Sequence, residues 1–360
     1  MKWDKSSVSR SGPGPSRREF LTASAAATGA AIASGLAGDS QANAATKPPA
    51  KSNRSAGPHA EFRAALGGPW PSFHTPFTRH GEIDFEAVRR MVDFLIEEAK
   101  AKAVVLTWGD SLCSLLTDDE VAELTQAICR HVKKRALVVA ADRQWWTGKE
   151  VAFARYCVEV GADMLMVLPP DWAASTTLDT LVAHYAAVAE HIPVMLVTNY
   201  LVKRGDQFGL DLAKRLVKEV PGVVAVKDDV CGEFIRRLCL EVGDRWVLSA
   251  GGQKQNHMNM VPYGVDGYLS TFISFKPAIA WQYWRAIEEG DLDAATAVIR
   301  DYDMPLFDYL LGVEGSFDAA VHGILELTGQ AGRWRRAPYY SLSDPQMEQL
   351  KEFLTKRRML

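Results

Sequence analysis

Residues 223–227 read Val-Val-Ala-Val-Lys, a short apolar run that ends in a lysine. Seven other runs of this kind occur between Ser72 and Thr271, and amphipathic, helix-like stretches separate them. Near-continuous apolar runs indicate strands that are covered on both sides, and their alternation with helices is typical of βα units and a parallel sheet. We therefore predict eight strands, at Ser72–Phe77, Ala103–Thr107, Ala136–Ala141, Asp163–Leu168, Pro193–Thr198, Val223–Lys227, Trp246–Ala250 and Gly267–Thr271.

Eight βα units predict an α/β fold, the (β/α)8 TIM barrel. An open doubly wound sheet is the lesser alternative, and the sequence has no G-x-G-x-x-G or Walker pattern to support it. Asp84 predicts a helix cap, and Thr117 to Glu120 and Thr147 to Glu150 are capping-box patterns. Residues 62–290 are assigned to the barrel, and residues 291–360 to a small C-terminal helical appendage with helices around Leu292–Leu311, Phe317–Leu327 and Asp344–Lys356.

The first 61 residues are not expected to belong to the barrel. Arg17 and Arg18 precede an Ala- and Gly-rich apolar run that ends near Gly38, and Ala42-Asn43-Ala44 has the small residues of a cleavage site. The run is too short and too small-sided to span a membrane comfortably, which disfavours an anchor. We interpret residues 1–44 as a twin-arginine export signal and residues 45–61 as a disordered linker. The mature protein should then be periplasmic or extracellular, without a stable membrane span.

Composition excludes several classes of protein. A net charge of −3 with interspersed Lys, Arg, Asp and Glu gives no basic field for a phosphate backbone, so nucleic acid is not an expected partner. The five cysteines are scattered, odd in number and without a C-x-x-C pair, which argues against both a disulfide framework and a zinc site. No cofactor and no metal is expected.

Lys227 is the sharpest chemical candidate, because working residues of such barrels lie at the carboxyl ends of the strands and in the loops that follow. An unperturbed lysine has a pKa of about 10.4 and is almost entirely charged at neutral pH. Burial lowers that pKa and can yield a neutral amine that attacks a carbonyl. The competing interpretation is a structural ion pair with Asp228 or Asp229, which spacing alone favours.

Several motifs occur together in one order. They are Thr75-Pro76-Phe77, Gly81 to Phe85, Leu115 to Glu120, Gly161-Ala162-Asp163, Pro169-Pro170, Val223 to Asp228 and Gly264 to Gly267. From about Trp70 to its end, the chain resembles the dihydrodipicolinate synthase and N-acetylneuraminate lyase family. The resemblance implies a class I aldolase or lyase that acts on pyruvate or a related 2-oxo acid through an imine on Lys227. It also implies a homodimer or homotetramer.

The family's substrate-binding positions are only partly retained. Its G-T-T-G-E stretch corresponds to Leu106 to Asp110, so Thr107, Trp108, Gly109 and Asp110 are expected to bind substrate, with Trp108 in place of a hydroxyl. The Pro-Tyr-Tyr of the synthases is replaced by Pro170-Asp171-Trp172. Ordinary dihydrodipicolinate synthase activity is therefore not expected. The remaining substrate-binding candidates are Asp171, Trp172, Thr198 and Ser270.

The larger departure concerns proton transfer. Val197 and Thr198 stand where the family has a Tyr-Asn pair whose tyrosine shuttles protons. Tyr200 is a candidate surrogate in the catalytic set, although a tyrosine that only packs the loop is the alternative. Asp229 stands where the family commonly has a small residue, and it either shuttles protons or holds Lys227 charged. His74 and Lys254 are expected to be structural, His74 as a core histidine and Lys254 on a helix surface.

The sequence thus favours a Schiff-base lyase that acts on a 2-oxo acid or a sugar acid. Two alternatives stay open. One is a catalytically weakened barrel that binds a small acid or sugar without turnover, and the other is a dehydratase of the same family.

Overall fold

The computed structural model describes residues 58–199, 201–251 and 253–360. The predicted export signal, most of the predicted linker and Tyr200 lie outside these residues. Helix α2 begins at Ala60, just inside the segment predicted as linker.

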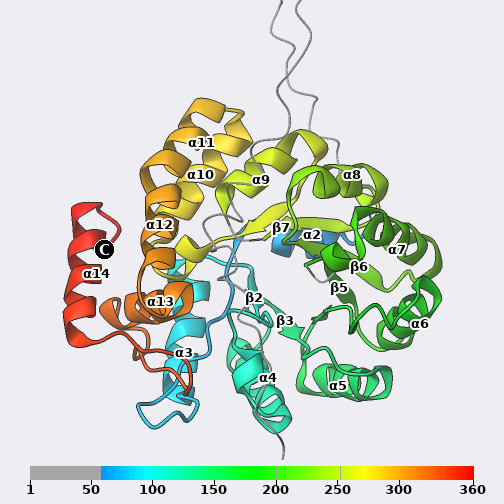
Figure 1. The fold of residues 1–360 in the computed structure, drawn as a ribbon, viewed down its shortest axis with the longest axis horizontal. Helices are drawn as coiled ribbons and strands as arrows, with labels where there is room; N and C mark the ends of the chain where they lie inside the picture. Colours follow the sequence, from blue (N-terminus) through cyan, green and yellow to red (C-terminus); the bar gives the residue numbers. More distant parts are fainter. Residues whose placement is uncertain (1–57, 200, 252) are drawn as a thin grey trace, which may run out of the picture. The chain divides into compact units, whose positions relative to one another are not determined.

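Eight parallel strands of the described chain form one sheet in the order β1-β8-β7-β6-β5-β4-β3-β2. A bridge between Ser72 and Val105 joins its two ends, so the sheet is nearly a closed barrel. The predicted (β/α)8 fold is confirmed, and Figure 1 shows the strands in the centre with helices around them. The strands are β1 Gly68–Trp70, β2 Ala103–Val105, β3 Leu137–Ala141, β4 Met164–Val167, β5 Val194–Val197, β6 Val223–Asp228, β7 Val247–Ala250 and β8 Gly267–Leu269.

The first strand was predicted wrongly at Ser72–Phe77, because β1 ends at Trp70. Pro71 and Pro76 carry no backbone N–H, so the predicted segment cannot form a continuous ladder. It makes separate contacts instead. The Phe73 N–H donates to the Val105 carbonyl at 2.8 Å, and Phe77 forms an antiparallel bridge with Ile83.

Helices follow the strands in the expected alternation. They are α2 Ala60–Leu66, α3 Phe85–Asp93, α4 Asp118–Val132, α5 Thr147–Val160, α6 Leu178–Ala189, α7 Asp206–Glu219, α8 Gly232–Val242, α9 Lys254–Met260, α10 Pro277–Glu289, α11 Leu292–Val298, α12 Met304–Gly312, α13 Ser316–Leu327 and α14 Asp344–Lys356. Shorter helical elements lie between them. Two are π-helical, η3 Phe94–Glu98 and η8 Ile299–Asp303, and three are the 3-10 turns η4 Cys113–Leu115, η5 Leu201–Arg204 and η7 Thr271–Ser274. A further 3-10 turn, η6, spans Val261–Tyr263.

Two of the three predicted helix caps form. The Asp84 carboxylate accepts hydrogen bonds from the N–H groups of Glu86 and Ala87, and Thr117 and Glu120 make a reciprocal capping box. The box predicted at Thr147 is wrong, because Thr147 is already the first residue of α5. Its hydroxyl lies 3.0 Å from His184 Nδ1.

Apolar side chains pack in two layers, one inside the barrel and one between the strands and the helices. Helix α2 closes the amino-terminal end of the barrel, because its Phe62 and Leu66 join the interior cluster. Arg63 holds α2 there through an ion pair of 2.6 Å with Asp266, which precedes β8. The opposite end, where the strands finish, is left for a site.

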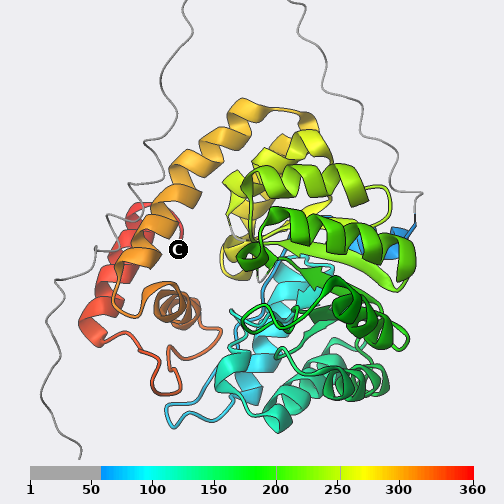
Figure 2. The same cartoon turned by 45° about the vertical axis from the view of Figure 1, so that its right-hand side comes forward.

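The helices predicted after the barrel are present. Figure 2 shows α12, α13 and α14 grouped on one side of the barrel. Of the described helices, none combines the length and the apolar character that crossing a membrane requires.

Candidate active site

A cavity of about 580 Å³ lies at the carboxyl ends of the strands. Residues from β4, β5, β6 and β8 and the loops after β2, β5, β6 and β7 surround it, and α12 and α13 cover one side. The described residues that line it are Thr107, Trp108, Gly109, Asp110, Met166, Leu168, Val197, Asn199, Lys227, Asp229, Gly251, Gln253, Asn256, Leu269, Thr271, Phe307, Leu311 and Phe317.

Lys227 lies at the base of this cavity. In the sheet it pairs with Val197 of β5 and Ser249 of β7, and only 8% of its surface is exposed. Its Nζ lies 2.6 Å from Asp229 Oδ1 and 2.5 Å from Oδ2. The amine therefore faces the cavity with a carboxylate as its partner, and of the two neighbours considered from the sequence, Asp229 is the one that binds it.

Thr198 organises the turn that follows Lys227. Its Oγ1 donates to Asp228 Oδ1 at 2.6 Å and accepts from the Asp229 N–H at 3.2 Å. Asp228 also accepts from the Cys231 N–H at 2.8 Å. Burial raises the pKa of the Asp228 carboxyl, and these hydrogen bonds oppose that effect. Thr198 was predicted to bind substrate, but it is not among the described residues that line the cavity, because its hydroxyl is used inside the turn.

The predicted stretch from Thr107 to Asp110 reaches the same cavity as Lys227. Thr107 Oγ1 lies 2.9 Å from Ser72 Oγ and accepts from the Asp110 N–H at 3.1 Å. All four residues of the stretch line the cavity, and Trp108 is half-buried there. The fold therefore brings this stretch together with the lysine, as a shared substrate pocket requires.

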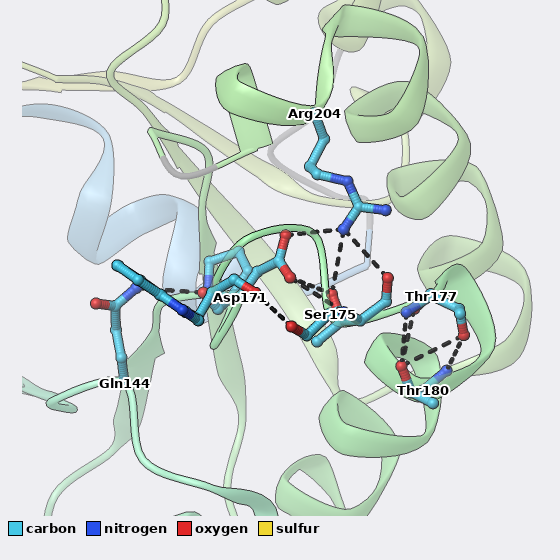
Figure 3. Close-up of polar contacts among 9 residues, drawn as sticks. Gln144, Asp171, Ser175, Thr177, Thr180 and Arg204 are labelled. Atoms are coloured by element: carbon cyan, nitrogen blue, oxygen red, sulfur yellow. Dashed lines mark hydrogen bonds and ion pairs between the residues drawn. The ribbon is translucent and has the colours of Figure 1, made fainter.

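Asp171, Trp172 and Ser270 do not reach the cavity, contrary to prediction. Asp171 lies 2.8 Å from an Arg204 nitrogen and accepts two hydrogen bonds from Thr176, so it fastens the loop before α6 (Figure 3). Trp172 points into solvent with 86% of its surface exposed. Ser270 is buried at the start of η7, and its neighbour Thr271 lines the cavity instead.

Some lining residues were not predicted as site residues. Asn199, Gly251 and Gln253 directly follow β5 and β7, so the rule that strand ends carry the site nominates their loops without choosing them. Phe307, Leu311 and Phe317 come from α12 and α13. A helical pattern alone does not indicate which distant surface a helix covers.

Lys254 was predicted on a helix surface, and this is wrong. Only 1% of it is exposed, and its Nζ lies 2.7 Å from Asp303 Oδ1 and 4.3 Å from the centre of the Phe272 ring. Burial lowers the pKa of the Lys254 amine, and the Asp303 carboxylate opposes this effect. His74 is a buried histidine, as predicted, and burial lowers its pKa.

Two carboxyl groups share a buried position behind β3. Asp142 and Glu150 are both fully buried, and the Asp142 Oδ2 accepts from the N–H groups of Gln144 and Leu168. Burial raises the pKa of both carboxyls, and for Glu150 the charge of Asp142 raises the pKa further. The native protein therefore retains protons here that an unfolded chain releases above about pH 4.

This retention predicts a pH-dependent stability. Because the folded-state pKa values are raised, the free energy of unfolding should fall as the pH rises from about 4 towards the folded-state values. Glu150→Gln removes one titrating group, so the slope should become shallower by up to about 1.4 kcal/mol per pH unit. Urea unfolding between pH 5 and 8 measures it, with the exposed Glu123 replaced by Gln as control. Parallel profiles for wild type and Glu150→Gln would contradict the prediction.

Within the described residues, no group of three or more His, Cys, Asp or Glu side chains is arranged to hold a metal ion. The cavity has the amine of Lys227 near the carboxyl end of β6. The model of the "Dihydrodipicolinate synthetase family" matches residues 65–357. The chain belongs to this family.

Individual relatives agree with that assignment. The chain is 27% identical to the "4-hydroxy-tetrahydrodipicolinate synthase" of Nitratidesulfovibrio vulgaris, over 80% of this chain and 97% of the relative. It is 26% identical to the "Probable 5-dehydro-4-deoxyglucarate dehydratase 2" of Streptomyces avermitilis, over 81% and 85%. N-acetylneuraminate lyase from Mycoplasma synoviae has the same fold, with a TM-score of 0.72 at 19% identity over 82% of this chain and 99% of the lyase. The curated relatives thus include a synthase and a probable dehydratase.

Proposed function

We propose that this protein is a class I lyase that forms an imine between Lys227 and a 2-oxo acid or a related sugar acid. The observation that carries the proposal is the placement of Lys227. Its amine ends a buried strand and faces a cavity large enough for a small organic acid. Thr107 and the loop up to Asp110 supply polar groups to the same cavity.

The imine would supply the electron-withdrawing group that the proposed reaction needs. A protonated imine withdraws electrons from the adjacent carbon, so a carbon–carbon bond there can break or form. Trp108 lines the cavity at the position where the family resemblance implies a hydroxyl, so the substrate is expected to differ from that of an ordinary dihydrodipicolinate synthase.

Reductive trapping tests the proposal. The protein is incubated with pyruvate and with sugar-derived 2-oxo acids, borohydride is added, and the intact mass and the modified peptide are measured. We expect one added acid per chain, located at Lys227. If no acid of the panel modifies Lys227, the imine proposal fails.

Two rivals have specific support. The ion pair with Asp229 favours a barrel that binds an acid without turnover, because a charged amine does not attack a carbonyl. The similarity to a dehydratase favours elimination of water from a sugar acid. Product analysis separates the three, since a lyase yields two carbon fragments, a dehydratase yields substrate minus water, and a binding protein yields neither.

We also propose that the protein is exported by the twin-arginine route and is periplasmic or extracellular. Arg17 and Arg18 before the apolar run support this. Replacing both by lysine should leave the precursor in the cytoplasm, as cell fractionation and immunoblotting would show. Unchanged export of the double variant would contradict the signal interpretation.

A homodimer or homotetramer is the oligomeric state we propose. The exposed Trp146 and Trp172, on the loops before α5 and α6, support a protein contact on this side of the barrel. Light scattering at micromolar concentration measures the mass of the particle. A monomeric mass would contradict the proposed oligomer.

A further inference from the structure

We infer that Asp229 is the acid–base group of this site, which takes the proton from Lys227 and later moves protons to and from the carbon next to the imine. The inference rests on the proposed imine chemistry and adds to it the identity of the proton carrier. Asp229 touches the reacting atom directly, since both of its oxygens lie within 2.6 Å of Lys227 Nζ.

Asp229 also reaches the place where a substrate binds. Its side chain lines the cavity and is about a quarter exposed, whereas Lys227 beneath it is almost fully buried. A carboxylate in this position is close to both the amine and the bound acid. It can therefore serve successive proton transfers without leaving its position.

The surrounding backbone is built to hold this carboxylate. The Asp229 N–H is fixed by Thr198 Oγ1, which is itself bonded to Asp228. On the other side the Gly251 N–H donates to the Asp228 carbonyl at 2.7 Å. A Cβ at Gly251 would overlap Asp229 Oδ1 and lie 2.8 Å from the Asp228 carbonyl oxygen. Glycine at 251 is therefore what leaves room for the Asp229 side chain beside Lys227.

Other described groups around the amine are less suited to this task. Val197, the partner of Lys227 on β5, has no proton to transfer. Ser249, the partner on β7, is fully buried and is not among the described residues that line the cavity. Asp110 is the second lining carboxylate, but it comes from the loop after β2 and makes no described ion pair with Lys227.

Imine formation can proceed with Asp229 as the only acid–base group. The Lys227 ammonium gives one proton to the Asp229 carboxylate, and the neutral amine attacks the 2-oxo carbon. The carbonyl π electrons move to oxygen, which receives a proton from the new C–N nitrogen. Asp229 then protonates that hydroxyl, water leaves, and the nitrogen lone pair forms the iminium. The ammonium, carboxylate and ketone have become an iminium, a carboxylate and one water.

The regenerated carboxylate is then ready for the carbon step. It removes a proton from the carbon next to the iminium, and the C–H electrons form the enamine double bond while the C=N electrons return to nitrogen. In the reverse direction the Asp229 acid returns a proton to the same carbon. Asp229 therefore acts on both nitrogen and carbon, so replacing it should change the two kinds of proton transfer to different extents.

Asp229→Asn should slow proton transfer at carbon far more than imine formation. Its amide cannot carry protons, so exchange of the pyruvate methyl protons in D₂O, followed by ¹H NMR, should slow by roughly 10²–10⁴-fold. Borohydride trapping of pyruvate on Lys227 should be slower than in wild type but should still occur, because water can exchange protons with nitrogen and oxygen, whereas a proton on carbon needs a positioned base. Persistent trapping also shows that the variant site is folded.

Two further variants sharpen the experiment. Asp179→Asn removes an exposed, ion-paired carboxylate at the start of α6 and should exchange at the wild-type rate. Tyr200→Phe tests the surrogate proposed from the sequence, because loss of exchange in this variant would assign the proton transfer to Tyr200. Wild-type exchange by Asp229→Asn, or loss of exchange in Tyr200→Phe alone, would overturn the role of Asp229. Absence of wild-type trapping would instead overturn the imine proposal itself.

Discussion

Lys254→Met should lower the free energy of unfolding by about 3–5 kcal/mol. The Lys254 amine and the Asp303 carboxylate are each only 2% exposed, and 2.7 Å separates them. Removing the amine leaves a buried carboxylate without a counter-charge, which costs far more than an intact buried pair contributes. Urea unfolding at neutral pH measures the loss.

The double variant Lys254→Met with Asp303→Asn gives the matched test. It removes the unpaired charge. The backbone N–H of residue 254 donates to Asp303 Oδ2 at 3.1 Å, and the side-chain oxygen of an asparagine can still accept this hydrogen bond. Part of the lost stability, at least about 1 kcal/mol, should return. If the double variant is no more stable than the single one, an unpaired charge is not the cause.

This ion pair also connects the barrel to the cover of the cavity. Lys254 directly follows Gln253, which lines the cavity, and Asp303 is the last residue of η8, directly before α12. Phe307 and Leu311 of α12 line the same cavity. The pair therefore holds α12 in register with the end of β7, so the C-terminal helices are part of the site rather than a separate appendage.

The barrel could be predicted because its signal is local and repeated. Runs such as Val223 to Lys227 are apolar on both faces, and the count of eight limits the topology to few choices. The first strand was misplaced because Ser72 to Phe77 has strand-like composition, while Pro71 and Pro76 interrupt the ladder. Composition reports how residues pack, but hydrogen bonding decides which of them form the strand.

The site residues, like the strands, were predicted only in part. Lys227 and the stretch from Thr107 to Asp110 were predicted correctly to share one cavity, because strand ends of a barrel meet at one side. Asp171 and Lys254 were misjudged, because their partners Arg204 and Asp303 lie 33 and 49 residues away. Whether a charged side chain binds substrate or pairs internally depends on such distant partners, which spacing does not reveal.

The second large effect is expected at Lys227, where Lys227→Arg should abolish trapping of every 2-oxo acid that modifies the wild-type protein. Arginine stays protonated at any accessible pH and has no amine to form an imine. It retains the positive charge, so Asp229 keeps an ionic partner and no carboxylate is left unpaired, and the variant should remain folded. Urea unfolding and far-UV circular dichroism check the fold beside the trapping assay.

The control is Lys214→Arg, on the outer helix α7, where the lysine pairs with Glu241 at 3.0 Å. Surface lysines also react slowly with 2-oxo acids and borohydride, so the modified peptide must be identified. Lys214→Arg should trap the acid at Lys227 to the wild-type extent. If Lys227→Arg still carries the acid at another cavity residue, the lysine is not the electrophile-binding group, and both the imine and the role of Asp229 beside it must be abandoned. If trapping is lost while the fold is kept, the ion pair seen here is the resting state of a nucleophile, because the same amine then both pairs with Asp229 and attacks the acid.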